Sequence, residues 1–415
     1  MSLPLVFLYL FFPSSSVSIN IKNNVCTKVA SYHLAPISPD CRYNPDVLSD
    51  VQAMSQRHGY SFEKLPVTTD DGYILNIFKI SSKNSVGDKL PVFVQHGIAE
   101  NSGAWADKGN RSLAYRLVEE GHDVYLGNLR GSIFSNKHVK YSVNDPRYWN
   151  FNLDIMAAND LRSMLNFVAK STGSKILYIG HSMGTTLSFM YSSEFSKEAS
   201  QILQGIIALA PVGFLNGVPI IELARPIGIP LLDVLSVLHI RGLLYQEKII
   251  HKLINVLCKN AVPEICYGFF SLATGPTKQF LPEDMLTFLS YWPSGLSIYQ
   301  LKHYLQIGAS KKFQKYDYGR IGNLKHYGSF KPPSYKLKDI KVPISLMYGE
   351  NDILFRQKNV DRLFHEIGSH SKSKYAISAG RQGYSHIDFV YAKNLEDDLY
   401  QLMFDVLSSQ MGSAK

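Results

Sequence analysis

Residues 175–195 read KILYIGHSMGTTLSFMYSSEF, and this stretch decides the fold of the chain. The apolar, partly β-branched run 175–179 is typical of a buried strand, and residues 184–195 favour a helix. Between them lies the G-x-S-x-G pentapeptide Gly180-His181-Ser182-Met183-Gly184. This motif needs a strand, a sharp turn and a helix to expose its serine at the carboxyl edge of a parallel sheet. We therefore predict Ser182 as a nucleophile; the alternative is a turn serine before a helix.

The rest of the chain repeats this alternation of strands and helices. Such a pattern predicts an α/β fold with a mostly parallel central sheet flanked by helices. The expected strands are 74–80, 91–95, 123–126, 175–179, 205–209, 343–348 and 374–377. The clearest expected helices are 110–120, 155–169, 184–195, 358–367 and 394–407.

The alternation is interrupted over residues 212–341. Helical, Pro- and Gly-punctuated segments fill this interval, and we expect no strand in it. The first part of the interval is apolar, so we predict a helical cap that is inserted above the sheet and covers an apolar substrate site. Ordinary core helices of a second lobe are the alternative.

A serine hydroxyl is a weak nucleophile at neutral pH, and it needs a histidine base that a carboxylate orients. Asp352 follows the expected strand 343–348, and His386 lies between the last expected strand and the final helix. Both therefore project from the same edge of the sheet as Ser182, and we predict that the three form a catalytic triad.

Other residues compete for these two roles. Glu350 is the alternative acid, because it lies in the same loop as Asp352. His365 and His370 are alternative bases, although the first falls within an expected helix and the second in a polar turn.

The tetrahedral intermediate needs backbone N–H donors for its oxyanion. We expect one from Met183, directly after the nucleophile, and one from Ile98 in the loop after the strand 91–95. His96 lies beside that loop and is expected to pack against the turn or to hydrogen-bond with it.

The composition indicates a folded chain with an excess of positive charge. Of 415 residues, 45% are hydrophobic and 12% aromatic, which excludes the charge-rich, aromatic-poor make-up of disorder. The net charge is +9, and residues 311–341 contribute most of it, with nine basic and two acidic residues. Aromatic residues alternate with these charges, as on nucleic-acid platforms and on segments that rest on lipid headgroups. A merely solvated surface is the alternative.

The N-terminus begins with the apolar run MSLPLVFLYLFF, which is too short to span a bilayer. Small residues follow it, so we predict a signal peptide over residues 1–18 and an N-terminal extension over 19–43. The four cysteines lie in two close pairs, at 26 and 41 and at 258 and 266, which suits two local disulfides in an oxidising compartment. Other pairings and buried free thiols are the alternatives. We expect no transmembrane segment in the mature chain.

Several stretches together resemble one family, the acid lipases of the α/β-hydrolase superfamily, which includes the gastric and lysosomal types. The similarity extends from about residue 44 to the C-terminus. The matching stretches are DGYIL at 71–75, QHG at 95–97, GHDVYLGN at 121–128, RG at 130–131, GHSMGTT at 180–186, LAP at 209–211 and SHIDF at 385–389.

The resemblance implies a secreted or lysosomal lipase that cleaves esters of neutral lipids, namely acylglycerols or cholesteryl esters. It implies an α/β-hydrolase core over 44–211 and 342–415 and a cap over 212–341. It also implies the same triad and oxyanion donors, and a disulfide between Cys258 and Cys266 in the cap.

Two positions bear on how closely the family pattern is followed. Met183 stands where the family usually has Gln, but the backbone N–H performs the chemistry, so activity should survive. Asn110 opens the sequon Asn110-Arg111-Ser112, and glycosylation is common in the family. A helix N-cap is the alternative role of Asn110.

The expected reaction is a two-step acyl transfer through Ser182, without a metal or organic cofactor. An acid pH optimum requires the site to lower the pKa of the histidine, because an ordinary imidazole is protonated at pH 5. The alternatives are an esterase or thioesterase for soluble substrates and a catalytically silent lipid-binding protein on the same fold.

Overall fold

The computed structural model of the 415-residue chain describes residues 22–83, 89–245 and 247–412. The predicted signal peptide, residues 1–18, lies outside the described residues. Within the described part, no helix is long and apolar enough to cross a membrane.

The central sheet is mostly parallel, as predicted. Its strand order is β13-β12-β9-β8-β5-β6-β4-β3, with β7 also paired to β4. The pairs from β6 to β13 are parallel, and those that involve β3, β4 and β7 are antiparallel. The strands are β3 Ser61–Thr68, β4 Tyr73–Ser81, β5 Val92–Gln95, β6 Val124–Asn128, β7 Lys137–His138, β8 Ile176–His181, β9 Leu203–Leu209, β12 Ile344–Tyr348 and β13 Lys372–Ala376.

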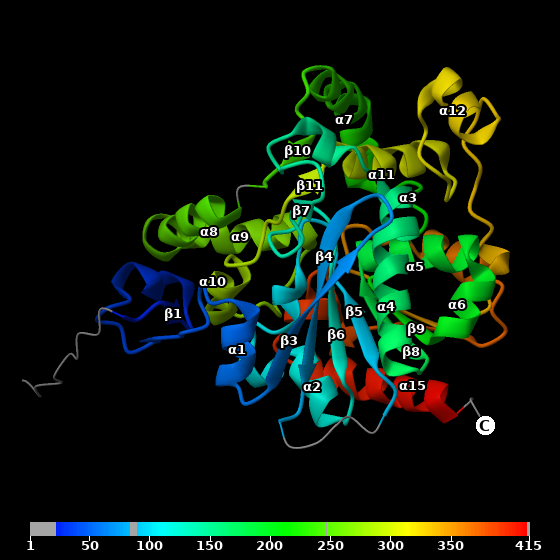
Figure 1. The fold of residues 1–415 in the computed structure, drawn as a ribbon. Coiled ribbons are helices and arrows are strands. Elements are labelled where there is room, and N and C mark those ends of the chain that lie inside the picture. The colour runs from blue at the N-terminus through cyan, green and yellow to red at the C-terminus, as the bar shows by residue number, and fades with distance from the viewer. Residues whose placement is uncertain (1–21, 84–88, 246, 413–415) are drawn as a thin grey trace, which may run out of the picture.

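Helices cover both faces of this sheet, and Figure 1 shows α4, α5 and α6 along one side of it. Helices of the core are α1 Val51–Arg57, α2 Leu113–Glu119, α3 Leu153–Ile155, α4 Arg162–Thr172, α5 Met183–Glu194, α6 Ser196–Ile202, α13 Gln357–Glu366, α14 Asp388–Tyr391 and α15 Gln401–Gly412. The 3-10 turns of the core span Ser102–Trp105, Gly109–Arg111, Pro146–Trp149 and Leu337–Asp339, and the π-helical turns span Met156–Leu161 and Glu396–Tyr400.

Two large hydrophobic clusters lie one on each face of the sheet, and a small third one joins α7 and α11 above it. In β5, Val92 and Val94 belong to the cluster that contains α2 and α15, whereas Phe93 belongs to the one that contains α4 and α5. This alternation is the period of a strand buried on both faces. It explains why the parallel strands read as continuous apolar runs in the sequence.

Between β9 and β12 the chain leaves the sheet and forms helices above it, which run from the upper left to the upper right of Figure 1. These are α7 Pro219–Val237, α8 Glu247–Val256, α9 Pro263–Thr274, α10 Met285–Phe288, α11 Ile298–Ser310 and α12 Gly319–Tyr327, with a π-helical turn Leu257–Ala261 and a 3-10 turn Pro282–Asp284. A disulfide joins Cys258 to Cys266.

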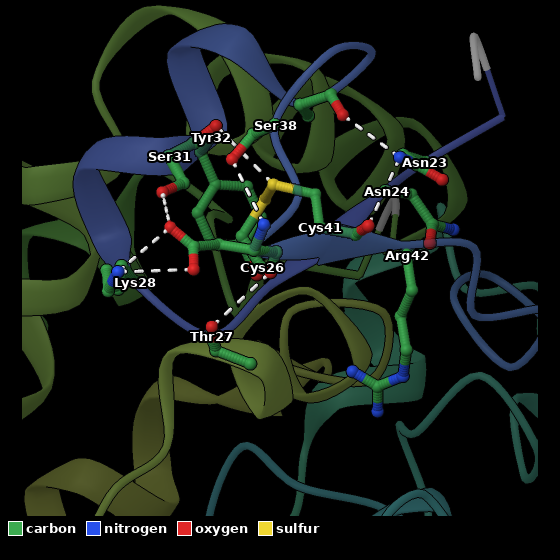
Figure 2. The surroundings of a disulfide bond; sticks show 12 residues. Asn23, Asn24, Cys26, Thr27, Lys28, Ser31, Tyr32, Ser38, Cys41 and Arg42 are labelled. Atoms are coloured by element: carbon green, nitrogen blue, oxygen red, sulfur yellow. Dashed lines mark hydrogen bonds and ion pairs between the residues drawn. A yellow bond between two sulfur atoms is a disulfide. The ribbon is translucent and has the colours of Figure 1, made fainter. Parts of the chain in front are cut away.

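The N-terminal extension forms a small disulfide-closed hairpin (Figure 2). Strands β1 Val25–Cys26 and β2 Cys41–Arg42 pair antiparallel around a 3-10 turn Val29–Leu34, and Cys26 is bonded to Cys41. The hairpin contacts the residues above the sheet: Tyr32 donates to the carbonyl of Pro282 at 2.8 Å, and Arg42 pairs with Glu283 at 3.0 Å. It therefore braces the segment between α9 and α10.

The structure departs from the predicted elements in several places, including the unpredicted two-residue strands β1, β2, β7, β14 Ser378–Ala379 and β15 Gln382–Gly383. Strand β3 was not predicted, because it mixes polar and apolar residues at the sheet edge and only Val67 of it is buried. Residues 212–341 do contain strands, β10 Gly242–Leu243 and β11 Leu296–Ser297, which pair with each other. Two residues are too few to show a periodicity. The predicted helix 155–169 is interrupted by a π-helical turn at Asp160, which bonds the buried Arg130 at 2.7 Å.

Candidate active site

Ser182 lies in the sharp turn between β8 and α5. Its φ of +52° is in the left-handed region, which costs a non-glycine residue about 1–3 kcal/mol. Its N–H donates to the carbonyl of Leu209 at 3.0 Å and so ties the turn to β9. A β-carbon on Gly184 would lie 2.6 Å from the carbonyl oxygen of Gln95, so only glycine fits there. The motif residues thus hold the serine in a strained turn at the carboxyl edge of the sheet.

The three residues predicted as a triad meet at this edge. Ser182 Oγ lies 2.7 Å from His386 Nε2, and His386 Nδ1 lies 2.7 Å from Asp352 Oδ2. Asp352 follows β12, and His386 precedes α14. The second carboxylate oxygen of Asp352 accepts from the N–H of Leu354 at 2.7 Å, which fixes the acid. This geometry allows a proton to move from Ser182 to His386 while Asp352 holds the imidazole tautomer.

The competing residues lie elsewhere. Glu350 is exposed, and Asp352, not Glu350, contacts the imidazole of His386. His365 on α13 and His370 after it are exposed as well.

The environment of His386 favours its charged form. Burial alone lowers the pKa of an imidazole, but the charge and the hydrogen bond of Asp352, with a further contribution from Glu100, outweigh burial. The pKa of His386 is therefore raised above its ordinary 6.5.

The two expected oxyanion donors lie next to the nucleophile, one in the lining of its cavity and one directly after it in the chain. Ile98 lines the same cavity as Ser182. Met183 is the first residue of α5, where backbone N–H groups lack partners within the helix. Its side chain is buried, and its sulfur accepts a hydrogen bond from Gln300 Nε2 at 3.5 Å. The side chain of Met183 thus packs into the interior, while its backbone N–H lies at the turn after Ser182.

A cavity of about 200 Å³ lies in front of Ser182. Its apolar walls come both from the loops at the carboxyl edge of the sheet and from the segment above the sheet, and its polar lining includes Ser182 and His386. The lining residues are Ile98, Ala99, Glu100, His181, Ser182, Thr274, Phe288, Trp292, His386 and Ile387.

Seven of these lining residues were not predicted as site residues from the sequence: Ala99, Glu100, His181, Thr274, Phe288, Trp292 and Ile387. Glu100 and His181 stand next to the recognised motifs and have their own chemistry, so an inspection of motif neighbours could have found them. Thr274, Phe288 and Trp292 come from the segment above the sheet, and no local signal in the sequence links them to the nucleophile.

Residues 311–341 are mainly an exposed basic surface. Eight of the nine basic side chains are exposed, and Lys315 is half-buried in an ion pair with Glu194 at 2.6 Å. Three of the alternating aromatics, Phe313, Tyr316 and Tyr335, are buried. They belong to the interior and cannot serve as stacking platforms, whereas Phe330 is 54% exposed.

The predicted glycosylation site Asn110 lies at the surface, and His96 lies in the interior. Asn110 is exposed in a 3-10 turn, and the residue that precedes α2 as its N-cap is Ser112. His96 is buried and hydrogen-bonds the turn, as expected: its Nε2 accepts from the N–H of Leu129 at 3.2 Å. Among the described residues, no cluster of three or more His, Cys, Asp or Glu could hold a metal ion.

Comparisons with known proteins agree with this fold. The family model described as a partial alpha/beta-hydrolase lipase region matches residues 51–109, and that of the alpha/beta hydrolase fold matches residues 91–234. Lipase member K of Homo sapiens is 32% identical over 374 residues, covering 86% of this chain and 90% of that protein. Gastric triacylglycerol lipase of Homo sapiens is 32% identical over 383 residues, covering 88% and 92%. Triacylglycerol lipase 1 of Arabidopsis thaliana is 29% identical over 364 residues, covering 86% and 89%.

The fold and the relatives define a carboxylic ester hydrolase of the α/β-hydrolase superfamily. Within that superfamily, the chain belongs to the acid lipase family of the gastric lipase type. Its two disulfides fit an oxidising secretory compartment.

Proposed function

We propose that the protein is a lipase that hydrolyses the ester bonds of neutral lipids, acylglycerols or cholesteryl esters, with Ser182, His386 and Asp352 as its catalytic triad. The observation that carries this proposal is the unbroken chain of 2.7 Å contacts from Ser182 Oγ through His386 to Asp352. The lipases among its relatives support the lipid substrate.

The reaction proceeds in two steps. Ser182 Oγ attacks the ester carbonyl carbon as its proton moves to His386 Nε2, and the N–H groups of Ile98 and Met183 stabilise the oxyanion. His386 returns the proton to the leaving alcohol, which leaves an acyl-Ser182 ester. Water then gives a proton to His386 and attacks the acyl carbon, which releases the fatty acid and regenerates the serine. Asp352 balances the positive charge of the imidazolium in both steps.

The apolar walls of the cavity favour a lipid over a small polar ester. Each buried methylene of an acyl chain contributes about 0.8 kcal/mol. The cavity of about 200 Å³ is smaller than the roughly 300–1,000 Å³ of sites for drug-sized ligands, so it accepts only part of a long-chain ester as it stands. We propose that the segment carrying Phe288 and Trp292 moves aside when lipid binds.

The surface around residues 212–341 suits a lipid–water interface. One face of α7 exposes six apolar side chains at helical spacing, each more than 40% exposed: Ile220, Leu223, Ile227, Leu231, Val234 and Val237. Residues 311–341 add exposed positive charge, which attracts anionic lipid. We propose that these two surfaces dock the enzyme on its substrate, with nucleic acid excluded as a partner.

The remaining sequence predictions stand as proposals with this function. Residues 44–211 and 342–415 form the catalytic core, 212–341 the cap and 19–43 an N-terminal extension. Residues 1–18 are a signal peptide that directs the chain to the lysosome lumen or outside the cell. Asn110 carries a glycan, which its exposure permits; digestion with an endoglycosidase should shift the wild type on a gel and leave Asn110→Gln unchanged.

Covalent labelling with a fluorophosphonate tests the nucleophile. The wild type should be labelled and Ser182→Ala should not, with Ser171→Ala, an exposed serine at the end of α4, as the matched control. Labelling that persists in Ser182→Ala refutes the assignment, and an unlabelled wild type favours a silent lipid-binding protein. Activity that does not rise on emulsified triacylglycerol or cholesteryl ester favours an esterase or thioesterase for soluble substrates.

A further inference from the structure

A carboxylate outside the triad reaches into the active site. Glu100 lies on the loop after β5, two residues beyond Ile98, and its side chain is 12% exposed. Its Oε2 accepts a hydrogen bond of 2.7 Å from the N–H of Gly97, which closes the loop on itself. A β-carbon on Gly97 would lie 3.1 Å from the β-carbon of Ser182 and 2.9 Å from this oxygen. Glu100 therefore fixes the peptide that lies directly against the nucleophile.

His181, the residue before the nucleophile, lies between Glu100 and the catalytic histidine. Its Nδ1 is 3.5 Å from Glu100 Oε2, and its Nε2 is 2.9 Å from the backbone carbonyl oxygen of His386. Its ring is buried, 5.0 Å from the ring of His386 between centroids. One imidazole thus joins the oxyanion loop, the nucleophile turn and the loop of the catalytic base.

His181 faces a different group with each of its ring nitrogens. Its Nε2 donates to the carbonyl oxygen of His386 at 2.9 Å, whereas its Nδ1 makes no hydrogen bond and lies 3.5 Å from Glu100 Oε2. Burial alone raises the pKa of a carboxyl, yet the neighbouring His181 and the N–H of Gly97 outweigh burial and lower the pKa of Glu100.

We propose that Glu100 and His181 form a second carboxylate–histidine pair, which positions the oxyanion loop and the catalytic histidine relative to Ser182. The pair touches none of the reacting bonds. It acts through Gly97 on the Ile98 N–H and through the carbonyl of His386 on the general base. This inference rests on the proposed serine mechanism and adds two positioning residues to it.

Steady-state kinetics of three variants on a soluble short-chain ester test the pair. Glu100→Gln keeps an acceptor for Gly97 and loses the charge, so kcat should fall about 10-fold. Glu100→Ala loses both the acceptor and the charge, and His181→Phe loses the ring nitrogens that face Glu100 and the carbonyl of His386. In each of these two variants kcat should fall about 10²-fold, the loss that a misplacement near 1 Å produces. KM should stay within about threefold in all three, because the pair orients catalytic groups and leaves the acyl cavity intact.

A double-mutant cycle and a control complete the experiment. Glu100→Ala/His181→Phe should cost no more than the worse single variant, because the two residues act as one unit. Glu350→Gln, an exposed acid at the same sheet edge, should keep kcat within twofold. Thermal unfolding of each variant, with the isosteric Glu100→Gln as the safest to fold, separates misplacement from unfolding.

Several results would overturn the proposal: kcat within twofold of wild type in Glu100→Ala, a loss confined to KM, or additive losses in the double variant. These outcomes differ from failure of the proposed function. If fluorophosphonate labels the wild type at Ser182 while Glu100→Ala retains kcat, the pair alone is refuted. If the wild type is not labelled, the proposed serine mechanism itself is refuted.

Discussion

The carbonyl oxygen of Thr274, the last residue of α9, accepts a hydrogen bond of 3.0 Å from the backbone N–H of His386. The helix above the sheet therefore ends on the loop of the proposed base. The next residue, Gly275, has a φ of +105°, and a β-carbon there would lie 2.2 Å from the carbonyl oxygen of Asn351, next to Asp352. The segment above the sheet and the loops that carry Asp352 and His386 are thus in direct contact at this junction.

Gly275→Ala should therefore displace the acid loop. The added methyl group meets backbone, which cannot rotate away, and the positive φ adds strain. We expect kcat on a soluble ester to fall by about 10²-fold, as for a catalytic group moved by about 1 Å. Gly217→Ala is the control, because it also has a positive φ but open space around its β-carbon. Equal activity of the two variants would contradict the link.

Substitution of the acids should discriminate between the two carboxylates of the loop after β12. Asp352→Asn keeps the shape but removes the charge that holds the His386 tautomer, and by analogy with serine proteases kcat should fall about 10⁴-fold. Glu350→Gln should stay near the wild type, because Glu350 is exposed. The reverse order of the two losses would reassign the acid. Steady-state kinetics on a soluble ester measure both.

The pH dependence of kcat/KM should report the state of His386 in the free enzyme. The base works only when neutral, and its pKa lies above the ordinary 6.5 because Asp352 and Glu100 outweigh burial. Activity on a soluble ester should therefore fall as pH drops through a midpoint above 6.5. Asp352→Asn should move the midpoint to lower pH, because it removes the main stabilising charge. A wild-type midpoint near pH 4 would show that the site lowers the pKa, as an acid optimum requires.

The fold and the meeting of Ser182, Asp352 and His386 could be predicted because the signals are local. Ser182 directly follows the apolar run of β8, Asp352 lies in the loop after β12, and His386 lies between β13 and α14. Parallel strands bring their carboxyl ends, and the loops that follow them, to one edge. The α/β-hydrolase fold predicted in this way is confirmed. The catalytic roles themselves remain predictions until the variants above are measured.

The parts that could not be predicted depend on packing between distant segments. Glu100 acquires its neighbour only when β5 and β8 pair, which brings His181 to 3.5 Å. Phe288 and Trp292 reach the cavity only through the path of the chain above the sheet. The sequence of residues 311–341 could not show which of its aromatic rings are buried, because tyrosine occurs both in protein cores and at surfaces.

Interfacial docking predicts a selective loss on lipid surfaces. Leu223→Gln and Ile227→Gln remove apolar side chains that are 76% and 72% exposed on α7. If these side chains insert into lipid, each change should weaken binding to phospholipid vesicles about 10-fold, equivalent to about 1.4 kcal/mol. Hydrolysis of a soluble ester should remain within twofold of the wild type. Val139→Gln, 59% exposed on the loop after β7, is the matched control, and vesicle co-sedimentation is the measurement. Unchanged binding of the α7 variants would remove this helix from the interface.

His96 predicts how the stability of the fold depends on pH. Its Nε2 accepts from the N–H of Leu129 and its Nδ1 lies 2.8 Å from the carbonyl oxygen of Gly97, so the ring must be neutral. Burial lowers the pKa of His96 to about 4. The unfolded chain, with a pKa near 6.5, then binds more protons than the folded chain between these values, so stability is lost as pH falls from about 6.5 to about 4. At about 1.4 kcal/mol per pKa unit, the loss approaches about 3 kcal/mol. Urea unfolding at pH 7 and pH 4.5 should show a smaller acid loss in His96→Gln than in the wild type, whereas the exposed His370→Gln should follow the wild type. An acid loss in His96→Gln as large as in the wild type would mean that other groups govern acid unfolding.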